Sequence, residues 1–373
     1  MKTKQIIFLL LLFIITIGLI IVANSSISRS GRLELIKLNY SGPVIDLERI
    51  NSNEFLLTTM KTFVETENGT IKLYFGEGEL HHIKIDTKNK NVEDLWSWKL
   101  SGYNIFSFPY IRGNQVAIAV TQSPNLPQNT TLYEIDLKNH TIRTIISINN
   151  FYTLTVNSFR DGRFLLTGYS NIGKKEIGKV IIIKESDIIF EKQLGNRTTA
   201  SLILDANKDG YEDFLVSSVT FGNTINTTVY LFLGTSNGFK VAKVINISGM
   251  ILDAKIVNLK GKNVILIDPH SIYLLNPSSW RLKRVFSARS GYFIVSLDCV
   301  DLNKDGIDEI VTIYTNATKR YLLELKYTNG LFTPVHSYSL NFTCFVVRHL
   351  RNGYFIVGTK DGLYLIKISN INY

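Results

Sequence analysis

Two short segments of the chain place oxygen-bearing side chains at matching positions. Segments 205–213 and 301–309 each carry Asp, Asn, Asp and an acidic residue at positions 1, 3, 5 and 9, with Gly at position 6. A hard cation such as Ca²⁺ needs about six to eight oxygen ligands, and alternating carboxylates and amides in a tight turn can supply them. Glycine allows a turn that a Cβ would hinder. The pattern predicts two structural calcium sites, with the side-chain ligands Asp205, Asn207, Asp209, Asp213, Asp301, Asn303, Asp305 and Glu309.

These segments differ from other acidic loops. An EF-hand requires a bidentate Glu at position 12, whereas Val216 and Thr312 stand there and each loop leads directly into an apolar segment. A turn rich in Asp, Asn and Gly that binds no metal would explain one loop, but it would not explain two copies. We therefore prefer calcium.

A short apolar segment recurs along the chain. Seven copies begin at Glu54, Gln115, Arg163, Asp213, Asn263, Glu309 and Tyr354. After a longer first interval they are spaced by roughly 45 to 50 residues, the length of a four-stranded propeller blade. A second strand-like segment follows each copy, and residues typical of hairpin turns fill the gaps. The apolar residues are mainly β-branched or aromatic, which favours strands over helices.

The last repeat ends after the strand that occupies third place in a blade, so its sheet lacks one strand. Residues 33–38 can supply this strand, which would join the two ends of the ring and cover an open sheet edge. We predict an all-β fold, a seven-bladed β-propeller over residues 33–373, in which the N-terminal strand closes the last blade. Two stacked β-sandwiches are the alternative, but they do not explain the single period.

Each acidic loop, together with the strand that follows it, resembles the FG-GAP or integrin-α type of β-propeller repeat. The resemblance is specific for the repeats at 196–245 and 290–335, and only periodic elsewhere. In that family, calcium lies in the loop between the first two strands of a blade and stiffens it. The resemblance implies that the position-7 carbonyl groups of Tyr211 and Ile307 are ligands as well.

The first repeat retains part of the pattern. Asp46, Glu48 and Glu54 align with ligand positions. Ile50 replaces the central Asp and Asn51 replaces the Gly, so we expect this repeat to have lost calcium.

The N-terminus has the pattern of an export signal. Lys2 and Lys4 precede an apolar run over residues 6–23. A secretory apolar region spans about 7 to 15 residues and a bilayer-spanning helix about 20. Residues 1–26 are therefore predicted to be a transmembrane helix that acts as a signal anchor, with a cleaved signal peptide as the alternative. The positive-inside rule places the rest of a single-pass protein outside the cell membrane; cleavage would leave it secreted.

The pattern Asn-x-Ser/Thr, the acceptor for N-glycosylation, is more frequent than the composition alone explains. This agrees with an extracellular glycoprotein. The pattern begins at Asn24, Asn39, Asn68, Asn129, Asn139, Asn196, Asn226, Asn246, Asn316 and Asn341.

Charge and cysteine content narrow the partners further. The net charge is +10, but Lys and Arg are scattered and no basic helix or RNP-type motif occurs, so we expect no nucleic-acid partner. The two cysteines, Cys299 and Cys344, fall in the inner strands of different repeats, and either a disulfide or two buried thiols is possible. The six histidines lack metal-ligand spacing.

The segment 85–100 resembles a quinoprotein-type propeller repeat, and this raises a redox alternative. Tryptophan is nearly absent from the other repeats, so we interpret Trp96 and Trp98 as blade packing. No nucleophile elbow, phosphate-binding loop or paired-carboxylate motif stands out.

These patterns predict a membrane-anchored, extracytoplasmic propeller that serves as a binding or scaffold module for a cell-surface protein or glycan, for example in adhesion. We expect binding rather than catalysis. The competing class is a cell-envelope enzyme, either polysaccharide-active or quinoprotein-like. A bound cofactor, or two close carboxylates that line the central channel, would indicate that class.

Overall fold

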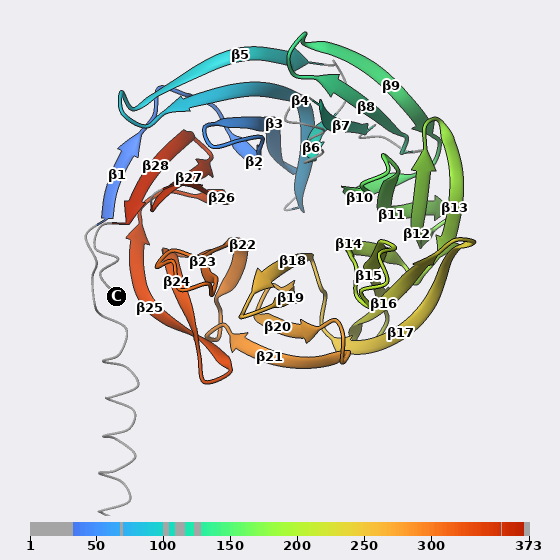
Figure 1. Cartoon of the computed structure of the whole chain (residues 1–373). Coiled ribbons are helices and arrows are strands. Elements are labelled where there is room, and N and C mark those ends of the chain that lie inside the picture. Colours follow the sequence, from blue (N-terminus) through green and yellow to red (C-terminus); the bar gives the residue numbers. More distant parts are fainter. Residues whose placement is uncertain are drawn as a thin grey trace, which may run out of the picture.

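The computed structural model describes residues 33–67, 70–99, 104–108, 116–122, 128–351 and 353–368. Their regular structure is entirely β, in seven antiparallel four-stranded sheets arranged as blades of a ring (Figure 1). The prediction of an all-β, seven-bladed propeller is confirmed. The anchor expected over residues 1–26 lies outside the described residues. Within the described ranges, no helix has the length and apolar character needed to cross a membrane.

The first three blades follow one another along the chain. Blade 1 contains β2 (Val44–Arg49), β3 (Glu54–Glu67), β4 (Thr70–Asp86) and β5 (Asn91–Lys99). Blade 2 contains β6 (Asn104–Phe108), β7 (Val116–Gln122), β8 (Thr130–Asp136) and β9 (Thr141–Ile148). Blade 3 contains β10 (Tyr152–Ser158), β11 (Phe164–Ile172), β12 (Lys175–Lys184) and β13 (Asp187–Gln193).

The next three blades repeat this order, with the first strand innermost. Blade 4 contains β14 (Arg197–Leu204), β15 (Asp213–Phe221), β16 (Ile225–Thr235) and β17 (Gly238–Ser248). Blade 5 contains β18 (Asp253–Asn258), β19 (Lys262–Asp268), β20 (Ser271–Asn276) and β21 (Arg281–Ser287). Blade 6 contains β22 (Phe293–Val300), β23 (Glu309–Thr315), β24 (Arg320–Thr328) and β25 (Leu331–Leu340).

Blade 7 joins the two ends of the chain. It contains β26 (Cys344–Arg351), β27 (Tyr354–Thr359), β28 (Gly362–Ile368) and β1 (Leu33–Lys37). The N-terminal strand β1 is the outer strand of this sheet and pairs antiparallel with β28, from Leu33 opposite Ile368 to Lys37 opposite Tyr364. The ring is thus held by backbone hydrogen bonds between segments at opposite ends of the sequence.

The core lies between adjacent blades. The second strand of a blade packs against neighbouring sheets on both of its faces; in β15, the first seven residues are all buried. Between blades 3 and 4, Phe159, Phe214 and Phe232 are almost fully buried. The rings of Phe214 and Phe232 stack with centroids 4.6 Å apart.

The ring has two distinct faces. Because successive strands of a blade are antiparallel, the connections from first to second strand and from third to fourth strand emerge on the same side. We call this side the loop face; it carries residues 159–163, 205–212, 259–261 and 301–308. The turns from second to third strand and the crossovers between blades lie on the opposite face.

Candidate functional site

The two acidic loops occupy equivalent places in blades 4 and 6. Residues 205–212 connect β14 to β15, and residues 301–308 connect β22 to β23. Both therefore lie on the loop face, between the first two strands of their blades. Position 9 of each loop, Asp213 or Glu309, is the first residue of the second strand.

The loop of blade 4 is closed by hydrogen bonds to its own side chains. The amide of Gly210 donates to Asp205 Oδ2 at 3.2 Å. The amide of Asp209 donates to Asn207 Oδ1 at 3.1 Å, and the amide of Tyr211 donates to Asp209 Oδ1 at 2.9 Å. Gly210 has φ of 88°, a left-handed conformation that glycine adopts without strain.

The loop of blade 6 repeats this arrangement position by position. The amide of Gly306 donates to Asp301 Oδ2 at 2.9 Å, and Gly306 has φ of 80°. The amide of Asp305 donates to Asn303 Oδ1 at 2.9 Å, and the amide of Ile307 donates to Asp305 Oδ1 at 2.8 Å. Matching sequences therefore give the same local fold in both blades.

The carboxylates at position 9 tie each loop to its blade. Asp213 is fully buried; its Oδ2 accepts from the amide of Ala206 at 2.8 Å and its Oδ1 from the amide of Gly234 at 2.9 Å. Glu309 is also buried, and its Oε2 accepts from the amide of Leu302 at 3.0 Å. Burial raises the pKa of Asp213 and of Glu309, although these amides oppose the effect.

The loops have the chemistry that a hard cation needs. In blade 4, Asp205 Oδ1 is a buried oxygen without a hydrogen-bond partner, so this acceptor is free to bind a cation. In the described part of the chain, no three His, Cys, Asp or Glu side chains are gathered in metal-binding geometry. The ligands expected for calcium in these loops also include Asn side chains and backbone carbonyl groups, both of which are suitable calcium ligands.

An acidic residue that the sequence analysis missed joins each loop to the preceding blade. At position 8, Glu212 Oε2 accepts from the amide of Arg160 in blade 3 at 2.7 Å. At the same position of the other loop, Asp308 Oδ2 accepts from the amide of Asn258 in blade 5 at 2.7 Å. We call these two contacts the interblade latches. Both acidic residues were visible in the sequence, but their partners lie about 50 residues away and only the fold brings them together.

The alignment of Asp46 and Glu48 with calcium-ligand positions was wrong. Both residues lie inside β2, not in a loop. The connection that follows is a tight turn over residues 50–53, in which the amide of Ile50 donates to the carbonyl group of Glu54 at 2.9 Å. The short turn shifts both carboxylates into the strand, so they cannot converge with Glu54 around one cation.

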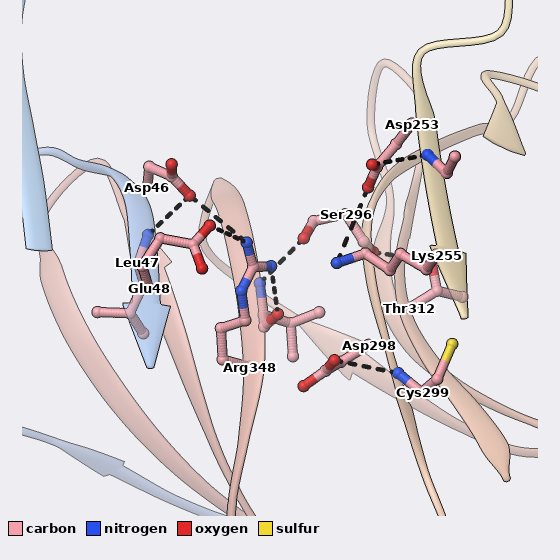
Figure 2. A network of polar contacts seen from close by, with 12 residues as sticks. Asp46, Leu47, Glu48, Asp253, Lys255, Ser296, Asp298, Cys299, Thr312 and Arg348 are labelled. Atoms are coloured by element: carbon pink, nitrogen blue, oxygen red, sulfur yellow. Dashed lines mark hydrogen bonds and ion pairs between the residues drawn. The ribbon is translucent and has the colours of Figure 1, made fainter. Parts of the chain in front are cut away.

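Asp46 and Glu48 instead belong to a charged network between inner strands (Figure 2). Arg348 on β26 places its Nη2 atom 3.5 Å from Asp46 Oδ1 and 3.3 Å from Glu48 Oε1. This contact bridges blades 7 and 1, and Glu48 and Arg348 are 300 residues apart in the sequence. We call the group Asp46, Glu48 and Arg348 the seam cluster.

Further contacts extend the network to blade 6. Ser296 Oγ accepts from the amide of Val347 at 3.2 Å, and Asp298 Oδ2 accepts from the amide of His349 at 2.7 Å. Polar side chains of the inner strands thus link blade 6 to blade 7 and blade 7 to blade 1. A separate ion pair lies within blade 5, where Lys255 Nζ is 3.8 Å from Asp253 Oδ2.

The seam cluster has unusual proton affinity. Burial raises the pKa of Glu48 to about 7, although Arg348 lowers it. Burial also raises the pKa of Asp46. Glu48 can therefore gain or lose a proton near neutral pH, and sequence reasoning missed this because its carboxylate and arginine come from different blades.

The two cysteines are free thiols, Cys299 on β22 and Cys344 on β26. Of the two possibilities left open by the sequence, the structure has the thiols. Burial raises the pKa of both, that of Cys344 to about 12, so neither is poised as a thiolate nucleophile.

The tryptophan pair packs between blades. The ring of Trp96 on β5 stacks on His140, with centroids 5.6 Å apart and 7° between the planes. Trp98 meets Tyr133 of blade 2 edge-on at 5.0 Å. These contacts support the interpretation of both residues as packing groups.

Comparison with known proteins supports the fold alone. No family model matches the chain, and no curated protein matches it. Among solved structures, the WD40 β-propeller domain of Doa1 is similar, with 14% identity, a TM-score of 0.54 and coverage of 91% of this chain and 98% of that one. Sqt1 from Saccharomyces cerevisiae has 9% identity, a TM-score of 0.55 and coverage of 91% and 100%.

A third similar structure is described as YCF48 bound to D1 peptide; it has 11% identity, a TM-score of 0.53 and coverage of 93% of this chain and 98% of that one. At such low sequence identities, the similarity supports a shared architecture but not a shared binding chemistry. By fold, the chain is a seven-bladed β-propeller, and the Doa1 domain to which it is similar is a β-propeller as well.

Proposed function

We propose that this chain is a calcium-binding scaffold propeller, anchored outside a cell membrane by residues 1–26, that binds a cell-surface protein or glycan. The twin acidic loops carry this proposal. Their resemblance to FG-GAP repeats, the apolar N-terminal run and the glycosylation acceptor patterns support it. Propellers commonly serve as binding modules, and one similar structure is described as bound to a peptide.

The face opposite the loop face offers a surface for the partner. Three apolar residues stand at or next to the start of the inner strands of blades 5, 6 and 7: Leu252 is 42% exposed, Phe293 43% and Phe345 37%. Partly exposed aromatic side chains bury much apolar area when they are covered, and they are frequent energetic centres of protein interfaces.

The proposed role of calcium is to stiffen the loops that carry the interblade latches. The side chains of Asp205, Asn207, Asp209 and Asp213, with the carbonyl group of Tyr211, would hold the ion in blade 4. Asp301, Asn303, Asp305, Glu309 and the carbonyl group of Ile307 would hold it in blade 6. Calcium would neutralise the carboxylates that crowd each loop, and this would stabilise the folded ring.

Calcium dependence is tested by thermal unfolding of the chain after residue 26 in excess calcium, excess magnesium and EGTA. At free calcium about 100-fold above Kd, each site stabilises the fold by about 2.7 kcal/mol, so Tm should fall by several degrees in EGTA. Magnesium should restore less, because it demands a stricter octahedral geometry. The matched variants Asp209→Asn and Asp305→Asn should each lose about half of the calcium response. An identical Tm in calcium and EGTA would contradict the calcium sites.

The seam cluster favours a second candidate, a cell-envelope enzyme. Two carboxylates with raised pKa values, close to one arginine, could serve in general acid catalysis. The arginine contact offsets their charge, so the cluster also has a purely structural explanation. If the wild type hydrolyses envelope polysaccharides and a folded Glu48→Gln variant does not, the chain is an enzyme. If the wild type shows no turnover, the scaffold function is favoured.

A further inference from the structure

A hollow of about 930 Å³ lies on the loop face over blade 5. It lies beside the long acidic loop 205–212 of blade 4, where blade 5 has only the short turn 259–261 between its first two strands. The loop of blade 4 forms one wall, and Tyr327 of blade 6 belongs to the other side. The volume is within the range of ligand-binding clefts.

Basic residues outnumber acidic ones in the lining of this hollow. Two acidic residues, Asp205 and Glu212, oppose six basic ones: Arg160, Lys208, Lys260, Lys262, Arg281 and Lys283. Four of these residues belong to blade 5, whereas Arg160 comes from blade 3 and Lys208 from blade 4. Positive charges that line one concave surface focus a field that attracts anions.

Most of this charge is available to a ligand. Arg160 Nε lies 3.6 Å from Glu212 Oε1, and Lys283 Nζ donates to the carbonyl group of Gly330 at 3.0 Å. The side chains of the other four basic residues have no ion-pair or hydrogen-bond partner among the residues that the structure describes. All four are exposed, so their charged groups are accessible to a ligand.

The lining of the hollow also contains apolar side chains. Ile256 of β18 is 41% exposed, and Ile203 and Leu204 of β14 and Leu274 of β20 are half-buried. We call these four residues the apolar floor. An apolar floor beneath a basic rim suits a ligand that combines carboxylates with hydrocarbon side chains. A sulfated or carboxylated glycan would satisfy the rim, but it has no apolar side chains to cover the floor.

We propose that this hollow docks an acidic segment of a partner protein, with its carboxylates against the rim lysines and an apolar side chain on the floor. The inference rests on the proposed binding function and names the chemistry of one partner surface. The docking site adjoins the acidic loop of blade 4, because Asp205 and Lys208 both line the hollow. A calcium ion in that loop would offset the nearby carboxylates and strengthen the positive field.

Fluorescence anisotropy with the chain after residue 26, in calcium, tests the docking site. The probe is a short labelled peptide in which glutamates alternate with leucines. The double variant Lys260→Glu/Lys262→Glu should raise the Kd of the peptide about tenfold or more, because two attractive rim contacts become repulsive. The matched control Lys174→Glu/Lys175→Glu makes the same charge change in the β11–β12 turn on the opposite face, and its Kd should stay within about twofold.

Three further probes decide the ligand class. A peptide with lysines in place of glutamates should not bind, and one with serines in place of leucines should bind more weakly. Equal binding of the lysine peptide, or equal Kd for the two double variants, would overturn the docking site. If a sulfated oligosaccharide displaces the peptide completely and the serine peptide binds as tightly as the leucine peptide, the hollow is a general anion site. That result would overturn a protein segment as its occupant. The calcium response is measured by thermal unfolding without these probes, so failure of the docking site would not contradict the calcium sites.

Discussion

At the scale of single residues, the seam cluster shows how the ring accommodates partly buried charge. Asp46 and Glu48 lie two residues apart on β2 and share one guanidinium group, that of Arg348. Taking a carboxylate out of water is costly unless a partner compensates it. Burial raises the pKa of Glu48 to about 7, and the neighbouring Asp46 carboxylate adds to this effect, whereas Arg348 opposes it.

The ionisation of Glu48 should make stability depend on pH. The pKa of its carboxyl is about 7 in the folded chain against an ordinary value of 4.5, so over this interval the folded state binds more protons than the unfolded state. The contribution of Glu48 is therefore fully present below about pH 4.5 and is lost as pH rises through about 7. Urea unfolding at about pH 5 and about pH 8 should show Glu48→Gln gaining stability relative to the wild type at the higher pH. The exposed Glu93→Gln is the control, and a pH-independent difference for Glu48→Gln would contradict the assignment.

At the scale of elements, the two acidic loops act between blades as well as within them. Each loop is held by the same pattern of hydrogen bonds, and each reaches the preceding blade through position 8. In blade 6 the contact is extended, because Asn258 Nδ2 also donates to the carbonyl group of Gly306 at 2.9 Å. The loops therefore clasp blade 3 to blade 4 and blade 5 to blade 6.

Removing a latch should destabilise the fold even without calcium. In EGTA, Asp308→Ala should lower the free energy of unfolding by about 1 kcal/mol, because the amide of Asn258 loses a charged acceptor. Asp308→Asn retains an acceptor and should recover most of the loss. Glu212→Ala should have a similar effect, and the double variant should be additive because the two contacts share no partner. If Asp308→Ala unfolds like the wild type in EGTA, the latch carries no stability.

At the scale of the whole molecule, closure of the ring depends on β1. This strand completes the sheet of blade 7 and covers the outer edge of β28. Ile36 packs against the apolar cluster that blades 7 and 1 share, whereas Leu35, its neighbour, is 38% exposed. Successive side chains of a strand point to opposite faces, so within β1 Ile36 faces the apolar cluster and Leu35 faces solvent.

Substitutions in β1 test the closure. Ile36→Asp should lower the free energy of unfolding by about 2 kcal/mol, because a carboxylate would face an apolar cluster without a partner. The matched change Leu35→Asp should stay within about 0.5 kcal/mol. Chemical denaturation compares the two. Equal losses of stability would mean that β1 contributes only its backbone hydrogen bonds and that the packing of Ile36 does not stabilise the ring.

The sequence by itself determined the repeat, the seven blades and the local form of the two acidic loops. These features are local: strands follow from apolar patterns within a few residues, and Asp, Asn and Gly close a loop on their own backbone. Tertiary structure decided what lies between blades. Asp46 and Glu48, which were expected in a loop, lie in the seam cluster. Glu212 and Asp308 accept hydrogen bonds from the preceding blades. Lysines and arginines from three blades line one hollow. Such contacts join residues from different blades, and one sequence read alone does not show which side chains will meet.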